Sequence, residues 1–180
     1  MPTQGSKMIM QVFEFSIIAS GLDPQANDFE SRFYDAGCDD ATVSFQKGHI
    51  IVDFAREAIS IEEAIASAVE CVEKAGAKID RVEPDPLVSL SEIAVRVGMS
   101  RAAVTQYASA QRGKGDFPAP VAKVTSDSSL WDWTSVARWF CAQGKISADQ
   151  VTVAEVVHDA NEAIQMHESV SKRIRDRIAA

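Results

Sequence analysis

Seven small or polar residues between positions 100 and 114 are of the types that contact nucleic acids. They are Ser100, Arg101, Ala102, Thr105, Gln106, Arg112 and Lys114. Arginine, threonine and glutamine can hydrogen-bond to base edges, and arginine and lysine also bind backbone phosphates. A small residue such as Ala102 lets a helix approach a groove closely. These residue types predict contact with double-stranded DNA if the chain presents them on one surface.

The surrounding sequence predicts two short helices joined by a tight turn. Ser89 or Ser91 is expected to cap the first helix, and Gly98 stands where the chain must turn sharply. Ser100 is expected to cap the second helix. Residues 100–110 would then be the recognition helix of a helix-turn-helix, which enters the major groove. The apolar positions of the first helix recur at helical spacing and are Leu90, Ile93, Ala94 and Val97.

The sequence beyond the second helix extends this pattern. It reads Arg112-Gly-Lys-Gly-Asp-Phe-Pro-Ala-Pro-Val121 and later Leu130-Trp-Asp-Trp-Thr-Ser-Val-Ala-Arg-Trp-Phe140. With Val97-Gly-Met-Ser-Arg101, these stretches resemble the winged helix-turn-helix of AlpA-type and excisionase-type regulators, which are relatives of MerR. The resemblance spans residues 87–140 of the 180-residue chain. Its most specific part is the Phe-Pro-Ala-Pro stretch with the tryptophan-bearing segment that follows.

The resemblance implies a β wing over about residues 112–132, and it implies that Ser100 and Arg101 begin the DNA-reading helix. The chain departs from the family at an inserted segment, 110–115, and at the wing tip, 125–129, where the family often has basic residues. Arg112 and Lys114 could replace those phosphate contacts, or they could belong to a solvated loop. The tryptophans are expected in the core rather than stacked on bases; they are Trp131, Trp133 and Trp139.

The charge of the chain is uneven. The formal net charge is -8, which alone disfavours nucleic-acid binding. Residues 1–85 carry 7 basic and 16 acidic residues, residues 86–146 carry 7 and 4, and residues 147–180 carry 4 and 6. Phosphates respond to the local field, so the segment balance matters more than the total. The one net basic segment contains the helix-turn-helix, although its surplus is modest.

The first 85 residues predict an α+β domain with the order β-α-β-β-α-β. That order is typical of the ferredoxin-like fold, which hosts many functions and therefore indicates none by itself. We expect this domain to dimerise, to sense a ligand or to bind a partner. The expected strands are Met10–Ala19, Ala41–Phe45, His49–Phe54 and Lys78–Val82, and the expected helices are Ala26–Ala36 and a helix between Ser60 and Gly76.

Glu83-Pro-Asp-Pro86 predicts a joint, because prolines favour extended backbone. The expected organisation is therefore residues 1–85, a winged helix-turn-helix over 86–146, and one long amphipathic helix over 147–180. Apolar residues at three- and four-residue spacing in that helix suit two arrangements. The helix could pair with another chain, or it could pack back on its own domain.

The remaining composition argues against several classes of protein. No apolar run approaches the length needed to span a bilayer, and the polar start, Thr3–Lys7, does not resemble a signal peptide. Three separated cysteines give no disulfide framework, so we expect buried thiols and a reducing cytoplasm; they are Cys38, Cys71 and Cys141. The histidines are too dispersed to bind a metal, and Asp39-Asp40 is expected in a turn. We therefore expect no enzymatic activity, cofactor or metal.

Two functions remain in competition. The first is a sequence-specific transcriptional regulator of bacterial or phage type that binds double-stranded DNA as a homodimer. The second is an antitoxin or adaptor whose acidic N-terminal domain binds a protein partner while the chain regulates its own operon. A ligand sensor is a third class, but the sequence names no pocket residues for it.

Overall fold

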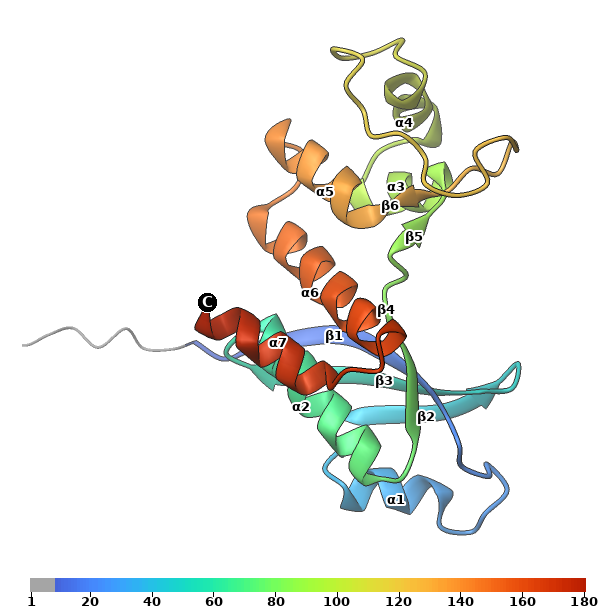
Figure 1. Ribbon diagram of the computed structural model, residues 1–180, viewed down its shortest axis with the longest axis vertical. Helices are drawn as coiled ribbons and strands as arrows, with labels where there is room; N and C mark the ends of the chain where they lie inside the picture. Colours follow the sequence, from blue (N-terminus) through green and yellow to red (C-terminus); the bar gives the residue numbers. More distant parts are fainter. Residues whose placement is uncertain (1–8) are drawn as a thin grey trace, which may run out of the picture. The chain divides into compact units, whose positions relative to one another are not determined.

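The computed structural model describes residues 9–180 and has a mixed α+β architecture (Figure 1). It divides into two compact units, one of Met1–Pro84 with Asp159–Ala180 and the other of Asp85–His158. The segment Thr3–Lys7, on which the expectation about a signal peptide rests, lies outside the described residues. None of the helices between residues 9 and 180 combines the length and apolarity that crossing a bilayer requires.

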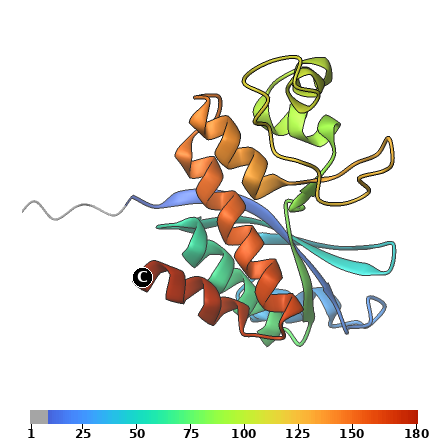
Figure 2. The ribbon, with the colours of Figure 1, turned by 45° about the horizontal axis from the view of Figure 1, so that its top comes forward.

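The first unit is built around a four-stranded antiparallel sheet with the order β2-β3-β1-β4. Alternating side chains of β3 point into the core, and α2 packs on that face (Figures 1 and 2). Lys47 and Gly48 join β2 to β3 with positive φ angles of 52° and 82°. The elements are β1 (Gln11–Ser20), α1 (Phe29–Asp35), β2 (Ala41–Gln46), β3 (His49–Ala58), α2 (Ile61–Lys74) and β4 (Lys78–Glu83).

The C-terminal segment corrects one expectation. Residues 147–180 do not form a single helix but two, α6 (Ala148–Gln165) and α7 (Val170–Ala179). His167 takes a positive φ of 58° between them, and Ser169 caps α7 by accepting a hydrogen bond from the Lys172 N–H at 3.3 Å. The chain reverses there, and α7 packs along α2 of its own unit (Figure 2). Of the two arrangements left open by the sequence, α7 adopts the intramolecular one.

The cysteines correct a second expectation. Cys38 and Cys71 are joined by a disulfide, with their Cα atoms 6.0 Å apart, and both side chains are buried. The odd number of cysteines gave no indication of this pair. The two cysteines become neighbours only because the fold brings the turn after α1 against α2. Cys141, in the second unit, is a free and partly buried thiol.

A buried arginine completes the packing beside the disulfide. The Arg56 guanidinium donates to both carboxylate oxygens of Asp40, at 2.8 and 2.7 Å, and to the Gly37 carbonyl oxygen at 2.8 Å. It also lies 4.8 Å from the centre of the Phe54 ring. Asp40 therefore holds the turn after α1 against β3, so one carboxylate of the Asp39-Asp40 pair has a structural partner.

Candidate nucleic-acid interface

The second unit contains the segment that the sequence singles out. Its elements are β5 (Leu87–Val88), α3 (Leu90–Val97), α4 (Arg101–Ala108), β6 (Trp131–Asp132), α5 (Trp133–Ala142) and the first part of α6. Ser89, rather than Ser91, caps α3. The Glu92 N–H donates to the Ser89 hydroxyl at 3.3 Å, and the Ser89 N–H donates to the Glu92 carboxylate at 2.7 Å. This backbone hydrogen bond lowers the pKa of Glu92 below its usual value of 4.5.

The turn between α3 and α4 follows the expected chemistry. Gly98 ends α3 in the left-handed region, at φ 67°, where a side chain would be strained. The Met99 N–H bonds back to the Ala94 carbonyl oxygen at 2.9 Å. Ser100 then starts α4, because its hydroxyl accepts from the Ala103 N–H at 3.2 Å. The sequence-predicted turn and both caps are therefore present.

One face of α4 is buried, and the opposite face is exposed. Val104 and Tyr107 face the core of the unit. The exposed face carries four of the sequence-predicted residues, at helical spacing, and these are Arg101, Ala102, Thr105 and Gln106. Arg101 makes no ion pair within residues 9–180, so its charge is available to a ligand. The Thr105 hydroxyl donates to the Arg101 carbonyl oxygen at 2.9 Å and keeps its acceptor capacity.

The loop after α4 places the remaining two predicted residues. The N–H groups of Gln111 and Arg112 both bond to the Gln106 carbonyl oxygen, at 2.9 and 3.0 Å. The Arg112 guanidinium stacks over the Tyr107 ring, 4.9 Å from its centre. Lys114 is exposed two residues later. The loop that carries both residues runs beside α4 (Figure 2).

An aromatic cluster fixes this loop to α5. Tyr107, Phe117, Trp139 and Phe140 meet edge to face with ring centres 5.0 to 5.9 Å apart. The Trp139 indole N–H donates to the Asp116 carboxylate at 3.1 Å, and the Trp131 indole N–H donates to the Pro118 carbonyl oxygen at 3.0 Å. Trp131 and Trp133 are buried and Trp139 is partly buried. The expected core role of the tryptophans is confirmed.

The segment expected to form a wing is mostly loop. β5 pairs with β6, and an isolated antiparallel bridge joins Ala122 to Leu130. Residues 123–129 form an exposed tip beyond that bridge (Figure 1). Lys123 begins the tip at φ 49° with its side chain exposed. Lys123 is not among the residues predicted from the sequence to contact DNA. The sequence feature that could have indicated this exposed lysine is its position directly after the apolar pair Val121-Ala122.

Two arginines of the net basic segment interact with other groups of the protein. Arg96 donates to the Asp85 carbonyl oxygen at 2.9 Å and lies 5.1 Å from the Trp133 ring centre. Arg138 forms an ion pair with Glu155 at 2.8 Å. Both are therefore held by their own unit. The exposed basic residues of the segment that make no ion pair within residues 9–180 are Arg101, Arg112, Lys114, Lys123 and Lys145.

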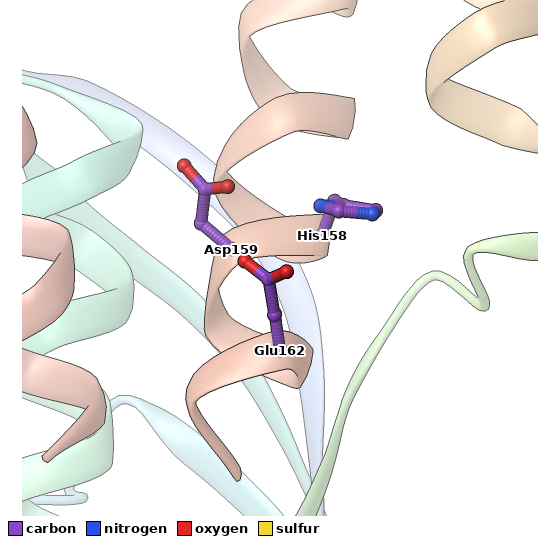
Figure 3. A group of neighbouring side chains, drawn as sticks. All are labelled: His158, Asp159 and Glu162. Carbon is purple, nitrogen blue, oxygen red and sulfur yellow. The ribbon is translucent and has the colours of Figure 1, made fainter. Parts of the chain in front are cut away.

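Three potential metal-ligating side chains lie on consecutive turns of α6, and Figure 3 shows them as His158, Asp159 and Glu162. Their ligand atoms lie within 4.8 Å of one another. The Asp159 carboxylate is already paired with Arg177 at 2.8 Å, and the Glu162 carboxylate is paired with Arg173. Because these arginines balance the negative charge, we assign no metal to the group.

No family model, curated protein or solved structure matches this chain. The function must therefore be argued from the arrangement of its own residues.

Proposed function

We propose that this chain is a sequence-specific double-stranded DNA-binding protein, a transcriptional regulator of bacterial or phage type. The observation that carries the proposal is the exposed face of α4. Its polar and small side chains make no ion pair with any residue of 9–180, while the opposite face is anchored by Val104 and Tyr107. A capped helix of this kind, following a short helix and a glycine turn, is suited to the major groove.

The topology supports the folds that we propose for the two units. In the first unit, the element order and the sheet order β2-β3-β1-β4 are those of a ferredoxin-like fold. In the second unit, α3 and α4 are followed by the bridge between Ala122 and Leu130 and by α5, which is the sequence of elements in a winged helix-turn-helix. On that basis we propose a ferredoxin-like fold for the first unit and a winged helix-turn-helix for the second.

The side chains divide into two roles. The Arg101 guanidinium can donate to base edges, and the Gln106 amide can both donate and accept. Thr105 has a hydroxyl and a methyl group for the same purpose. Arg112, Lys114 and Lys123 lie in loops, where a cation can follow the phosphate backbone without fixing the base sequence. The exposed N-terminal amides of α4 offer a further phosphate contact.

We also propose that the chain binds DNA as a homodimer. The recognition helix spans Arg101–Ala108 and can touch only a few base pairs, so useful specificity requires a second half-site. The excess of basic over acidic residues in 86–146 is small, so DNA binding depends more strongly on a second copy.

The proposal is tested by selecting bound sequences from a random DNA library with the full chain. We expect an enriched motif, and we expect affinity for it to fall steeply with salt. The double variant Arg101→Ala/Gln106→Ala should lose the enrichment while keeping its far-ultraviolet circular dichroism. Failure of the wild-type chain to enrich any motif at low salt would contradict sequence-specific binding.

The antitoxin or adaptor function remains the second candidate. It is favoured by the open face of the sheet, where Ser16 lies between Glu83 and Asp53 and where Glu14 adds a third carboxylate. Such a face could cover a basic surface of another protein. Co-expression with the product of a neighbouring gene tests it. A stoichiometric complex lost in Glu14→Lys/Asp53→Lys supports the candidate, and separate elution of the two proteins rejects it.

A further inference from the structure

The two edges of the four-stranded sheet differ in whether their outward-facing backbone groups have hydrogen-bond partners. At the β4 edge, the Val82 N–H and carbonyl groups are both hydrogen-bonded to the side-chain amide of Asn161. At the other edge, β2 pairs with β3 on one side, and no strand of the described chain pairs with its outer side. The β2 sequence, Ala41-Thr-Val-Ser-Phe-Gln46, contains neither a charge nor a proline, which are the usual means of protecting an edge.

The register of the β2–β3 pair shows which groups face outward. Gln46 pairs with His49 across the two-residue turn, and the Ala55 N–H bonds to the Asp40 carbonyl oxygen at 3.2 Å. Backbone groups alternate in direction along an antiparallel strand. The even-numbered residues of β2 therefore face β3. The backbone groups of Ala41, Val43 and Phe45 point away from the sheet.

We propose that two copies of this chain pair through β2, antiparallel about a two-fold axis at Val43, so that their sheets join. A symmetric antiparallel pair that is centred on a residue whose backbone groups face outward places a hydrogen-bonded pair on its axis. Centring on Val43 lets Val43 exchange two hydrogen bonds with the partner's Val43. It also lets the Phe45 N–H donate to the carbonyl oxygen of the partner's Ala41, and the symmetry repeats this bond.

Charge supports this register. Pairing about Val43 places Lys47 beside the partner's Asp39, once on each side of the axis. Both side chains are exposed, and neither has an ion pair within residues 9–180. Centring on Phe45 would set Val43 opposite the turn lysine, and centring on Ala41 would use an N–H that already bonds to the Cys38 carbonyl oxygen at 3.2 Å. Centring on Thr42 or Ser44 would set Lys47 opposite the partner's Gly37 or the partner's Ala41, which carry no charge. Val43 is thus the centre that sets Lys47 opposite the partner's Asp39 and leaves the N–H of the central residue free.

The apolar surface beside the edge fits the same arrangement. Phe45 pairs with the buried Ile50, so it lies on the helix side of the sheet, yet 46% of it is exposed. Tyr34 of α1 is 69% exposed beside a hollow that Ala41 and Val43 also line. The partner's Phe45 would stand opposite Ala41, at that hollow. Pairing would therefore cover Phe45 and Tyr34 together, which a lone chain leaves in water.

The test uses the full chain in analytical ultracentrifugation over a range of concentrations. The wild type is expected to be dimeric, and Val43→Pro is expected to be monomeric. Proline removes an N–H that faces away from β3, so the β2–β3 ladder should survive, as an unchanged circular dichroism spectrum would show. Val43→Thr keeps the N–H and serves as the matched control, which should remain dimeric.

A charge exchange gives a second measurement that does not depend on Val43→Pro folding. Lys47→Glu should weaken the dimer about tenfold, because it sets like charges together twice, and Asp39→Lys/Lys47→Glu should restore it. A monomeric wild type, a dimeric and folded Val43→Pro, or no rescue by the double exchange would each overturn the proposal. A monomeric wild type would also contradict the homodimer of the proposed function. The results with the variants test the β2 pairing separately from the DNA contacts, because the pairing uses nothing from α4.

Discussion

The side-chain amide of Asn161 forms two hydrogen bonds with the backbone of Val82. Its oxygen accepts from the Val82 N–H at 2.9 Å, and its nitrogen donates to the Val82 carbonyl oxygen at 2.8 Å. The residues are 79 positions apart, and both are buried. The amide reproduces the contact of a neighbouring strand and so closes the outer edge of β4 with a single side chain.

Replacing Asn161 with alanine should destabilise the first unit by about 2 kcal/mol, because two buried backbone groups lose their partners. Urea denaturation followed by circular dichroism measures this change. Gln165→Ala, at an exposed position of the same helix, is the control and should change stability by less than about 0.5 kcal/mol. Equal effects of the two substitutions would show that the Asn161 amide does not protect the edge.

Two isoleucines of α7 should respond very differently to truncation. Ile174 is 0% exposed and Ile178 is 56% exposed. Ile174→Ala should therefore cost about 3 kcal/mol, and Ile178→Ala less than about 0.5 kcal/mol. The measurement is again the free energy of unfolding. If α7 instead exchanged between chains, Ile174→Ala would alter the oligomeric state as strongly as the stability, and the intramolecular packing would be rejected.

The disulfide joins Cys38 and Cys71, which lie 33 positions apart in the sequence. Such a cross-link typically stabilises the folded state by about 3 to 4 kcal/mol through the unfolded chain. Adding a reductant should lower the stability of the wild type by that amount and leave Cys38→Ala/Cys71→Ala unchanged. Cys141→Ala, which removes only the free thiol, should respond to the reductant as the wild type does.

Thiol counting under denaturing conditions determines whether the bond forms in the cell. One reactive thiol without reductant, and three with it, are expected for an oxidised chain. Three thiols in both cases, in protein isolated with its thiols trapped, would show that the reducing cytoplasm expected from the sequence prevails there.

Local chemistry predicted the elements well, and long-range contacts explain what it missed. The Ser100 cap and the Gly98 turn depend on groups within three or four residues, so their residue types suffice to predict them. The disulfide and the inward turn of Arg96 depend on neighbours that only the fold supplies. The break between α6 and α7 lies between these cases. Ser169 is a recognisable cap, but apolar residues continue at helical spacing on both sides of it. The sequence therefore gives no clear sign that the chain reverses there.

The capping box of α3 should make the second unit sensitive to acid. Hydrogen bonds from Ser89 lower the pKa of Glu92 in the folded chain below 4.5. A carboxylate whose folded pKa is depressed stabilises the fold above its unfolded pKa, and this contribution is lost as the pH falls through the folded pKa. Glu92→Gln keeps an acceptor for the Ser89 N–H but does not titrate.

The stability of the wild type should therefore fall more than that of Glu92→Gln between about pH 6 and pH 3. Tryptophan fluorescence during urea denaturation isolates this unit, because the three tryptophans of the chain, Trp131, Trp133 and Trp139, all belong to it. Ser89→Ala should lose about 1 kcal/mol near neutral pH. Parallel pH profiles for the wild type and Glu92→Gln would exclude a role for Glu92.

The proposed division of roles around α4 predicts two distinct DNA-binding defects. Arg101→Ala should cost about 1 to 3 kcal/mol on the selected motif and little on random DNA, because a base-edge contact is lost. Lys114→Ala should weaken both DNAs alike and reduce the salt slope by about 1, because one phosphate contact is lost. Arg138→Ala removes a cation that is paired with Glu155, so it should leave both affinities unchanged. If Arg101→Ala and Lys114→Ala had the same effect on motif and random DNA, α4 would not be the element that distinguishes sequences.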